Sequence, residues 1–225
     1  MLNNVIFSIK NGEKVAIIGK NGTGKTTIFY LIERFLNPAA GEILVNGIDV
    51  KEYEINSYRN AFACINQDSY LFNMPILENI VLYSCPQREL LDRVIAQTDI
   101  QPLLDICKGP VGVNGQSLSG GQRQKIIFAR MLLREKSCCL LDEATSNLDK
   151  ESKIIVAQAF QTFLKGKTVL LIAHSVELLH YVDKIIQLDG TGGIIEYDSY
   201  DALLASAPDI EDLFRHDGIA DSTSG

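Results

Sequence analysis

A glycine-rich stretch near the start of the chain has residue types suited to binding phosphate groups. Residues 19–26 read Gly-Lys-Asn-Gly-Thr-Gly-Lys-Thr, between a predicted strand at Val15–Ile18 and a predicted helix at Gly24–Phe35. Glycines let backbone N–H groups turn towards phosphates, and the helix N-terminus adds partial positive charge. We expect Lys25 to reach the β- and γ-phosphates of a nucleotide and the Thr26 hydroxyl to bind Mg²⁺. The predicted nucleotide-binding residues are Gly19, Asn21, Gly22, Thr23, Gly24, Lys25, Thr26 and Thr27.

An apolar run that ends in two carboxylates is suited to complete such a site. Ser137–Leu141 predicts a buried strand, and Asp142 and Glu143 follow it directly. Because ligands of a doubly wound sheet sit at the carboxyl ends of its strands, this pair and the glycine-rich stretch can converge. We expect Asp142 to hold Mg²⁺ and Glu143 to act as the general base for the attacking water. The alternative is a pair of acids favoured at a helix N-terminus by the helix dipole alone.

A second helix start with the chemistry of an anion site lies in the middle of the chain. Ser119 precedes Gly120, Gly121 and Gln122, and a predicted helix covers residues 122–134. Serine is a favoured N-cap, and two glycines let a ligand approach the backbone closely. Taken alone, this segment is simply a capped helix.

In combination, these motifs resemble those of the nucleotide-binding domain of ATP-binding-cassette (ABC) transporters of the exporter type. Leu118–Gln122 is similar to the family's signature motif, and the resemblance extends over nearly the whole chain. By the same resemblance, Gln67 corresponds to the Q-loop glutamine, Asp149 to the D-loop, and His174 to the switch histidine that contacts the γ-phosphate. The segments Leu71-Phe-Asn and Glu78-Asn-Ile are typical of exporters.

The resemblance implies a mechanism. Two such domains would face each other head to tail, with each ATP between Gly19–Thr26 of one and Ser119–Gln122 of the other. Gln67 would bind Mg²⁺ with Thr26 and Asp142 and would report to a transmembrane domain. The implied partners are therefore a second nucleotide-binding domain and a transmembrane domain, at the cytoplasmic face of a membrane. The implied cofactors are ATP and Mg²⁺.

The predicted elements that must position these residues alternate between strand and helix. This pattern favours an α/β fold of the P-loop NTPase (RecA-like) class, with a mostly parallel sheet, flanking helices and a small antiparallel portion. We expect one domain over residues 1–225. Its core would be residues 1–68 and 136–216, with an inserted helical subdomain at about 69–135 and a disordered tail at 217–225. The predicted strands are Val5–Ile9, Lys14–Ile18, Glu42–Val45, Ala61–Ile65, Ser137–Leu141, Thr168–Ala173, Lys184–Leu188 and a hairpin partner, Gly193–Tyr197; further helices are predicted at Lys150–Leu164 and Val176–Tyr181.

Three features depart from the family pattern. The family's first strand, its adenine-stacking aromatic residue and its transmembrane domain are expected to lie outside this sequence, and Phe7 is expected to be a core residue. Since stacking of a base on an aromatic ring contributes roughly 1–3 kcal/mol, we expect the chain to bind ATP weakly. Val113 stands where the family often has an acid that contacts the membrane domain, and Glu196–Tyr200 lacks the family's usual Gly and His.

Composition narrows the partners and the other possible functions. With a net charge of −7 and no cluster of basic residues, nucleic acid is an unexpected partner. No apolar run reaches the roughly 18–20 residues of a membrane-spanning helix, so we expect no direct insertion into a membrane. The five cysteines include no Cys-x-x-Cys pair, which favours reduced, buried thiols. The alternatives to a transport ATPase are an ABC-type ATPase unrelated to transport and a module that clamps ATP without cleaving it.

Overall fold

A six-stranded sheet forms the centre of the computed structural model, which describes residues 2–66, 69–82, 84–142, 157–158, 161–173, 176–208, 210 and 214. The strand order is β4-β5-β6-β1-β7-β8, and all neighbours are parallel except β7 and β8. The strands are β1 (Lys14–Ile18), β4 (Phe62–Ile65), β5 (Cys138–Asp142), β6 (Thr168–Ile172), β7 (Lys184–Leu188) and β8 (Ile194–Tyr197). The predicted mostly parallel sheet and its antiparallel hairpin partner are therefore present.

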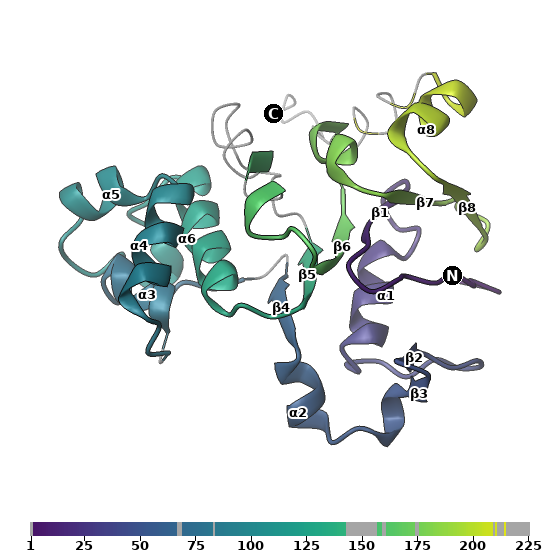
Figure 1. The fold of residues 1–225 in the computed structure, drawn as a ribbon, viewed down its shortest axis with the longest axis horizontal. Coiled ribbons are helices and arrows are strands. Elements are labelled where there is room, and N and C mark those ends of the chain that lie inside the picture. The colour runs from purple at the N-terminus through teal and green to yellow at the C-terminus, as the bar shows by residue number, and fades with distance from the viewer. Residues whose placement is uncertain are drawn as a thin grey trace, which may run out of the picture.

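The helices lie on both sides of this sheet (Figure 1). They are α1 (Lys25–Ile32), α2 (Ile55–Asn60), α3 (Ile76–Val81), α4 (Arg88–Gln97), α5 (Gln101–Ile106), α6 (Gly120–Leu133) and α8 (Tyr200–Ser206), with 3₁₀ turns at Val50–Glu52, Val113–Gly115 and Val176–Tyr181. Helices α3 to α6 form a group beyond the edge strand β4, as expected of an inserted helical segment. A small antiparallel pair, β2 (Leu44–Val45) and β3 (Ile48–Asp49), lies near α2.

The alternation of side chains along the central strands creates two hydrophobic cores. Val15 and Ile17 of β1 pack into one core with Phe29 of α1. Ala16 and Ile18 belong to the other core, which contains Phe128 of α6. Because both faces of β1 are covered, its sequence is a continuous apolar run with no polar alternation. The strand is thus held rigidly at the point where the glycine-rich stretch begins.

Some predicted elements were wrong or incomplete. Residues 5–9 form no strand, although Phe7 and Ile9 pack against the core as expected of alternating residues. Val176–Tyr181 is a 3₁₀ turn and not an α-helix. The short helices α2 and α8 were not predicted, and their starts are capped by Glu54 and Ser199. Most of the predicted helix Lys150–Leu164, and the whole of 217–225, lie outside the described residues.

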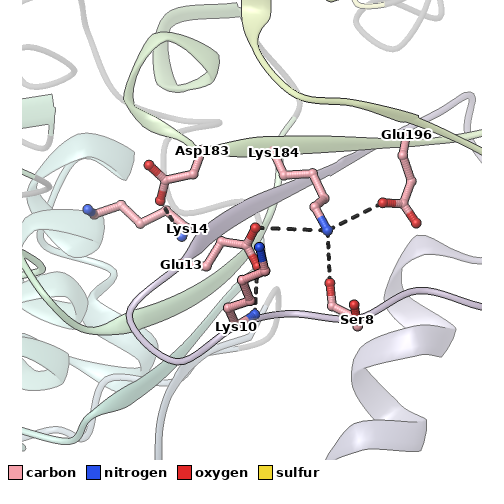
Figure 2. Close-up of polar contacts among 7 residues, drawn as sticks. All are labelled: Ser8, Lys10, Glu13, Lys14, Asp183, Lys184 and Glu196. Atoms are coloured by element: carbon pink, nitrogen blue, oxygen red, sulfur yellow. Dashed lines mark hydrogen bonds and ion pairs between the residues drawn. The ribbon is translucent and has the colours of Figure 1, made fainter.

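A half-buried lysine of β7, Lys184, fastens the first segment of the chain to the sheet (Figure 2). The Nζ atom of Lys184 on β7 donates to the Ser8 carbonyl at 3.0 Å and lies 3.3 Å from Oε2 of Glu196 and 3.9 Å from Oε1 of Glu13. The backbone N–H of Lys10 bonds to the other carboxylate oxygen of Glu13 at 2.6 Å. Side chains, and not a neighbouring strand, therefore hold the segment that was predicted as a strand.

Replacing Lys184 by Met is expected to lower the free energy of unfolding by about 1–3 kcal/mol. The Lys184 side chain is only 14% exposed, so its charge-assisted contacts are less weakened by solvent than those of a surface ion pair. Urea unfolding of the whole chain measures the change, and Lys10→Met, at an exposed position of the same cluster, is the matched control with an expected effect within about 0.5 kcal/mol. Equal effects of the two variants would contradict the role of Lys184.

Two further properties concern membranes and thiols. Within the described part of the chain, the helices are all too short or too polar to cross a membrane.

The five cysteines are free, and burial raises the pKa of the Cys138 thiol to about 12 and that of Cys139 to about 11. These two thiols are therefore protonated and weakly nucleophilic near neutral pH.

Candidate functional site

The glycine-rich stretch is the tight turn that joins β1 to α1. Gly19 follows the last residue of β1, and Gly24 is the N-cap of α1 in a left-handed conformation with φ of 103°. A side chain on Gly24 would be strained there, and its Cβ would lie 2.9 Å from a methyl group of Leu2. Only glycine fits this position. The glycine allows the turn to continue directly into the helix, as the phosphate-binding prediction requires.

Lys25 lies inside this turn. Its side chain is buried, and its ammonium group donates to the carbonyls of Gly19 at 2.6 Å and Lys20 at 3.1 Å. The Thr23 hydroxyl also donates to the Lys20 carbonyl, at 2.8 Å. The turn is thus closed around a positive charge placed at the N-terminus of α1, where an anion is favoured. Of the other predicted residues, Asn21 and Gly22 are exposed and Thr27 is half-buried.

Asp142 meets Thr26 across the sheet. The Thr26 hydroxyl donates to Oδ2 of Asp142 at 3.0 Å, although the two residues are 116 positions apart in the sequence. Asp142 ends β5 and is only 3% exposed, and β6 alone separates β5 from β1. The predicted convergence of the two motifs is therefore present. A hydroxyl and a buried carboxylate side by side are the hard oxygen donors that Mg²⁺ prefers, so these residues fit the expected metal.

Four predicted residues lie outside the described residues: Gln67, Glu143, Asp149 and His174. The structure nevertheless describes the strand ends that lead to three of them. Strands β4, β5 and β6 end at Ile65, Asp142 and Ile172, and they are parallel neighbours. The Ala173 N–H also bonds to the Ile17 carbonyl of β1 at 3.1 Å. The sequence positions that precede Gln67, Glu143 and His174 thus share one edge of the sheet with the glycine-rich turn.

The segment Ser119–Gln122 begins helix α6, as predicted. The Ser119 side chain accepts a hydrogen bond from the Gln122 N–H at 3.2 Å, and the Gln122 side chain accepts one from the Ser119 N–H at 2.9 Å. This reciprocal capping box fixes the helix start. Ser119 is exposed, while Gly120 and Gly121 are half-buried. Figure 1 shows α6 in the helical group, separated from α1 by strands of the central sheet. Val113, in the preceding loop, is also exposed.

A pocket that sequence reasoning missed adjoins the Thr26–Asp142 pair. We call it the α1 pocket: its volume is about 200 Å³, and its other walls are formed by Phe29, Tyr30, Glu33, Asn66 and Ser69. The spacing of Thr26, Tyr30 and Glu33 on α1 places them on one helix face. That spacing was the available signal, but a glutamate in a helix ordinarily faces solvent.

Comparison with known proteins places these features in a family. A family model described as "ABC transporter" matches residues 2–146. The chain is 40% identical over 210 residues to the "ATP-dependent lipid A-core flippase" of Neisseria gonorrhoeae. The matched region covers 90% of this chain and 33% of that protein. It is 38% identical to the "Heterocyst differentiation ATP-binding protein HepA" of Nostoc sp., over 91% of this chain and 34% of that one.

A solved structure agrees with the sequence matches. "Structure of a bacterial Atm1-family ABC exporter with ATP bound" matches with a TM-score of 0.87 and 31% identity, over 96% of this chain and 39% of that one. The chain thus spans about a third of the length of the curated relatives it matches. The fold, the glycine-rich turn and the family match agree: this chain belongs to the ABC transporter family and contains its ATP-binding domain.

Proposed function

We propose that this chain hydrolyses ATP with Mg²⁺ and thereby powers the movement of a substrate across a membrane by an ABC transporter. The observation that carries this proposal is the 3.0 Å contact between Thr26 and Asp142. It joins the end of the phosphate-binding turn to a buried carboxylate from a separate strand. A turn that merely reverses the chain direction would not require this pairing.

The chain's own residues would divide the work as follows. Lys25 would exchange its contacts with the Gly19 and Lys20 carbonyls for contacts with the β- and γ-phosphates. Thr26, Asp142 and Gln67 would hold Mg²⁺, which would neutralise phosphate charge when bound. Glu143 would accept the proton of the attacking water, and His174 would contact the γ-phosphate. Each role follows from the family resemblance. It is supported by the strands that lead to Gln67, Glu143 and His174, which end at the same edge of the sheet as the strand before the glycine-rich turn.

The exposed start of α6 suggests where a second copy would contribute. Since Ser119 is exposed and α6 lies away from α1, the signature segment is free to contact the ATP of another nucleotide-binding domain. A triphosphate held between two helix N-termini would join the two domains, and loss of its γ-phosphate would let them separate. Asp149 would lie in the segment that follows Glu143 at this interface.

The remaining partner would be the membrane-spanning part of the transporter. The matched relatives are about three times as long as this chain, which supports a partner of that kind. We propose that the domain works at the cytoplasmic face of the membrane, where ATP is available. The name of the Neisseria relative specifies lipid A-core, and the membrane-spanning part would determine whether this transporter moves a similar lipid.

A double-mutant cycle on Thr26 and Asp142 tests this function. Thr26→Val and Asp142→Asn are each expected to weaken the binding of ATP in the presence of Mg²⁺ by about tenfold or more, because each removes an oxygen ligand or its charge. The double variant should lose less than the product of the two single losses, because both residues serve one ion. Isothermal titration calorimetry measures the affinity for ATP, and the same titration with excess EDTA is the control, in which all variants should match the wild type. Losses of affinity that are additive and that persist in EDTA would contradict the proposal.

A further inference from the structure

The α1 pocket contains two buried oxygen atoms that no donor reaches within the described part of the chain. Glu33 is 7% exposed, and its Oε2 atom has no hydrogen-bond partner. Oδ1 of Asn66, which lines the same pocket, is also buried without a partner. Glu33 is moreover the C-cap of α1, where the negative end of the helix dipole opposes a carboxylate. Two acceptors in this position are costly to bury unless a donor or a cation meets them.

Two arginines near Glu33 are bound to other groups. Arg34 donates to the Tyr53 carbonyl at 2.8 Å, and Arg59 donates to the main-chain carbonyls of Glu33 and Arg34, each at 3.0 Å. The carboxylate of Glu33 is close enough to Cys64 to help burial raise the pKa of that thiol, but a thiol is a weak donor. Among the described residues, neither arginine therefore neutralises the Glu33 carboxylate.

The polar lining of the α1 pocket offers oxygen ligands of several kinds. Glu33 contributes a carboxylate oxygen and Asn66 an amide oxygen. Ser69 adds a hydroxyl, which accepts a hydrogen bond from the Asn66 N–H at 3.0 Å. Thr26 and Asp142 form the part of the lining that belongs to the expected Mg²⁺ site. Among the described residues of this lining none is histidine or cysteine, so the pocket suits a hard cation and not a soft transition metal.

The charge and size of the pocket favour a monovalent ion over a second divalent one. The described residues contain no group of three or more His, Cys, Asp or Glu side chains arranged to hold a metal. Of the two carboxylates in the described lining, Asp142 is expected to serve Mg²⁺, which leaves Glu33. One carboxylate, two neutral oxygens and a volume of about 200 Å³ suit a larger, partly hydrated ion better than a small octahedral one. A Mg²⁺ ion at Thr26 and Asp142 would also repel a divalent neighbour about twice as strongly as a monovalent one.

We propose that the α1 pocket binds a monovalent cation of the size of K⁺, with Oε2 of Glu33, Oδ1 of Asn66 and the Ser69 hydroxyl as its protein ligands. Water molecules complete its coordination. The choice of a monovalent charge rests in part on the proposed function, which assigns Mg²⁺ to the neighbouring Thr26 and Asp142. The bound ion joins α1 to the segment after β4, because Glu33 ends the helix and Asn66 follows the strand. It thereby holds in place the residue that directly precedes Gln67.

The site can be tested on the 225-residue chain without ATP, Mg²⁺ or a membrane. KCl is exchanged stepwise for choline chloride at constant ionic strength, with EDTA present, while backbone amide resonances are followed by NMR. The methyl groups of choline shield its charge, so choline cannot replace K⁺ among oxygen ligands. We expect saturable shifts that depend on K⁺ and are centred on Glu33, Asn66 and Ser69. The binding of K⁺ should weaken about tenfold or more in Glu33→Gln, since the charged ligand is lost.

Two further variants separate a bound cation from a merely structural role of these side chains. Glu42→Gln removes the same charge as Glu33→Gln at an exposed position and should bind K⁺ like the wild type. Asn66→Asp replaces a neutral ligand by a charged one of similar size. It should strengthen the binding of K⁺ by about threefold or more, because affinity rises with the number of charged ligands. General damage to the pocket would instead weaken the binding.

Identical resonances in KCl and in choline chloride would overturn the proposal, because water alone would then satisfy the two oxygens. It is also overturned if Glu33→Gln binds K⁺ as the wild type does, or if Asn66→Asp binds K⁺ more weakly. Displacement of K⁺ from this pocket by an equal concentration of Mg²⁺, in a titration without EDTA or nucleotide, would overturn the monovalent assignment. Since the K⁺ titration contains no nucleotide, its failure leaves the proposed function standing. A chain that binds K⁺ but no ATP would contradict the proposed function alone, so the two failures are distinguishable.

Discussion

ATP turnover should fall by about 10²–10⁴-fold when Glu143 is replaced by Gln, which is the range expected for the loss of a general base. Glu143 directly follows Asp142, whose carboxylate lies 3.0 Å from the Thr26 hydroxyl at the end of the glycine-rich turn. Gln keeps the size and polarity of the side chain but cannot accept the proton of the attacking water. The measurement is steady-state phosphate release at saturating ATP and Mg²⁺, at protein concentrations that allow two copies to associate.

The same variant should keep its affinity for ATP, since the phosphate-binding turn is unchanged. With the γ-phosphate retained, two copies should remain associated after ATP is added, which light scattering can detect. Glu135→Gln, at an exposed position before β5, is the control and should turn over ATP at the wild-type rate. A Glu143→Gln rate within about twofold of the wild type would show that another group accepts the proton.

Replacing Asn79 by Ala should reduce the free energy of unfolding by about 3–4 kcal/mol, because the variant leaves several buried groups without partners. Asn79 is fully buried on α3. Its side chain accepts from the Phe72 N–H at 2.9 Å and from the Arg130 guanidinium at 3.2 Å, and it donates to the carbonyls of Phe72 and Met74. The Arg130 guanidinium also donates to the Asn79 and Tyr70 carbonyls, at 2.8 and 2.9 Å.

These bonds join helix α6 to the segment that follows Gln67, so their loss should also loosen the two elements from each other. Urea unfolding of the whole chain measures the effect. Asn73→Ala is the matched control: Asn73 is exposed and accepts one bond from the Gly112 N–H at 3.0 Å, so a loss of about 1 kcal/mol or less is expected. Similar losses in the two variants would mean that the buried network adds little.

The sequence was sufficient to predict the parts of the site whose chemistry is local. The glycine-rich turn, the N-cap Ser119 and the strand that ends at Asp142 each depend on residues a few positions apart, and the structure has all three. The buried parallel strands were equally evident, because strands covered on both faces are continuous apolar runs. The contact between Thr26 and Asp142 could be expected as well, since both follow strand ends of one parallel sheet.

Other features depend on tertiary packing that no local pattern encodes. Residues 5–9 alternate like a strand, yet the Ser8 carbonyl bonds to the Lys184 side chain and no ladder forms. The burial of Glu33 and of Asn66 results from the approach of the segment after β4 to α1, which the spacing within α1 does not reveal. The Arg130–Asn79 network likewise joins two residues that are 51 positions apart in the sequence and lie on different helices.

The central claim is that one nucleotide with its metal occupies the turn at residues 19–26 beside Asp142. Titration of the wild-type chain with ATP and Mg²⁺, followed by NMR of its backbone amides, tests this most directly. We predict saturable binding of one ATP per chain, the largest shifts at residues 19–26 and at Asp142, and a marked loss of affinity when Mg²⁺ is removed. Saturable shifts centred on another surface, or binding indifferent to Mg²⁺, would contradict the account.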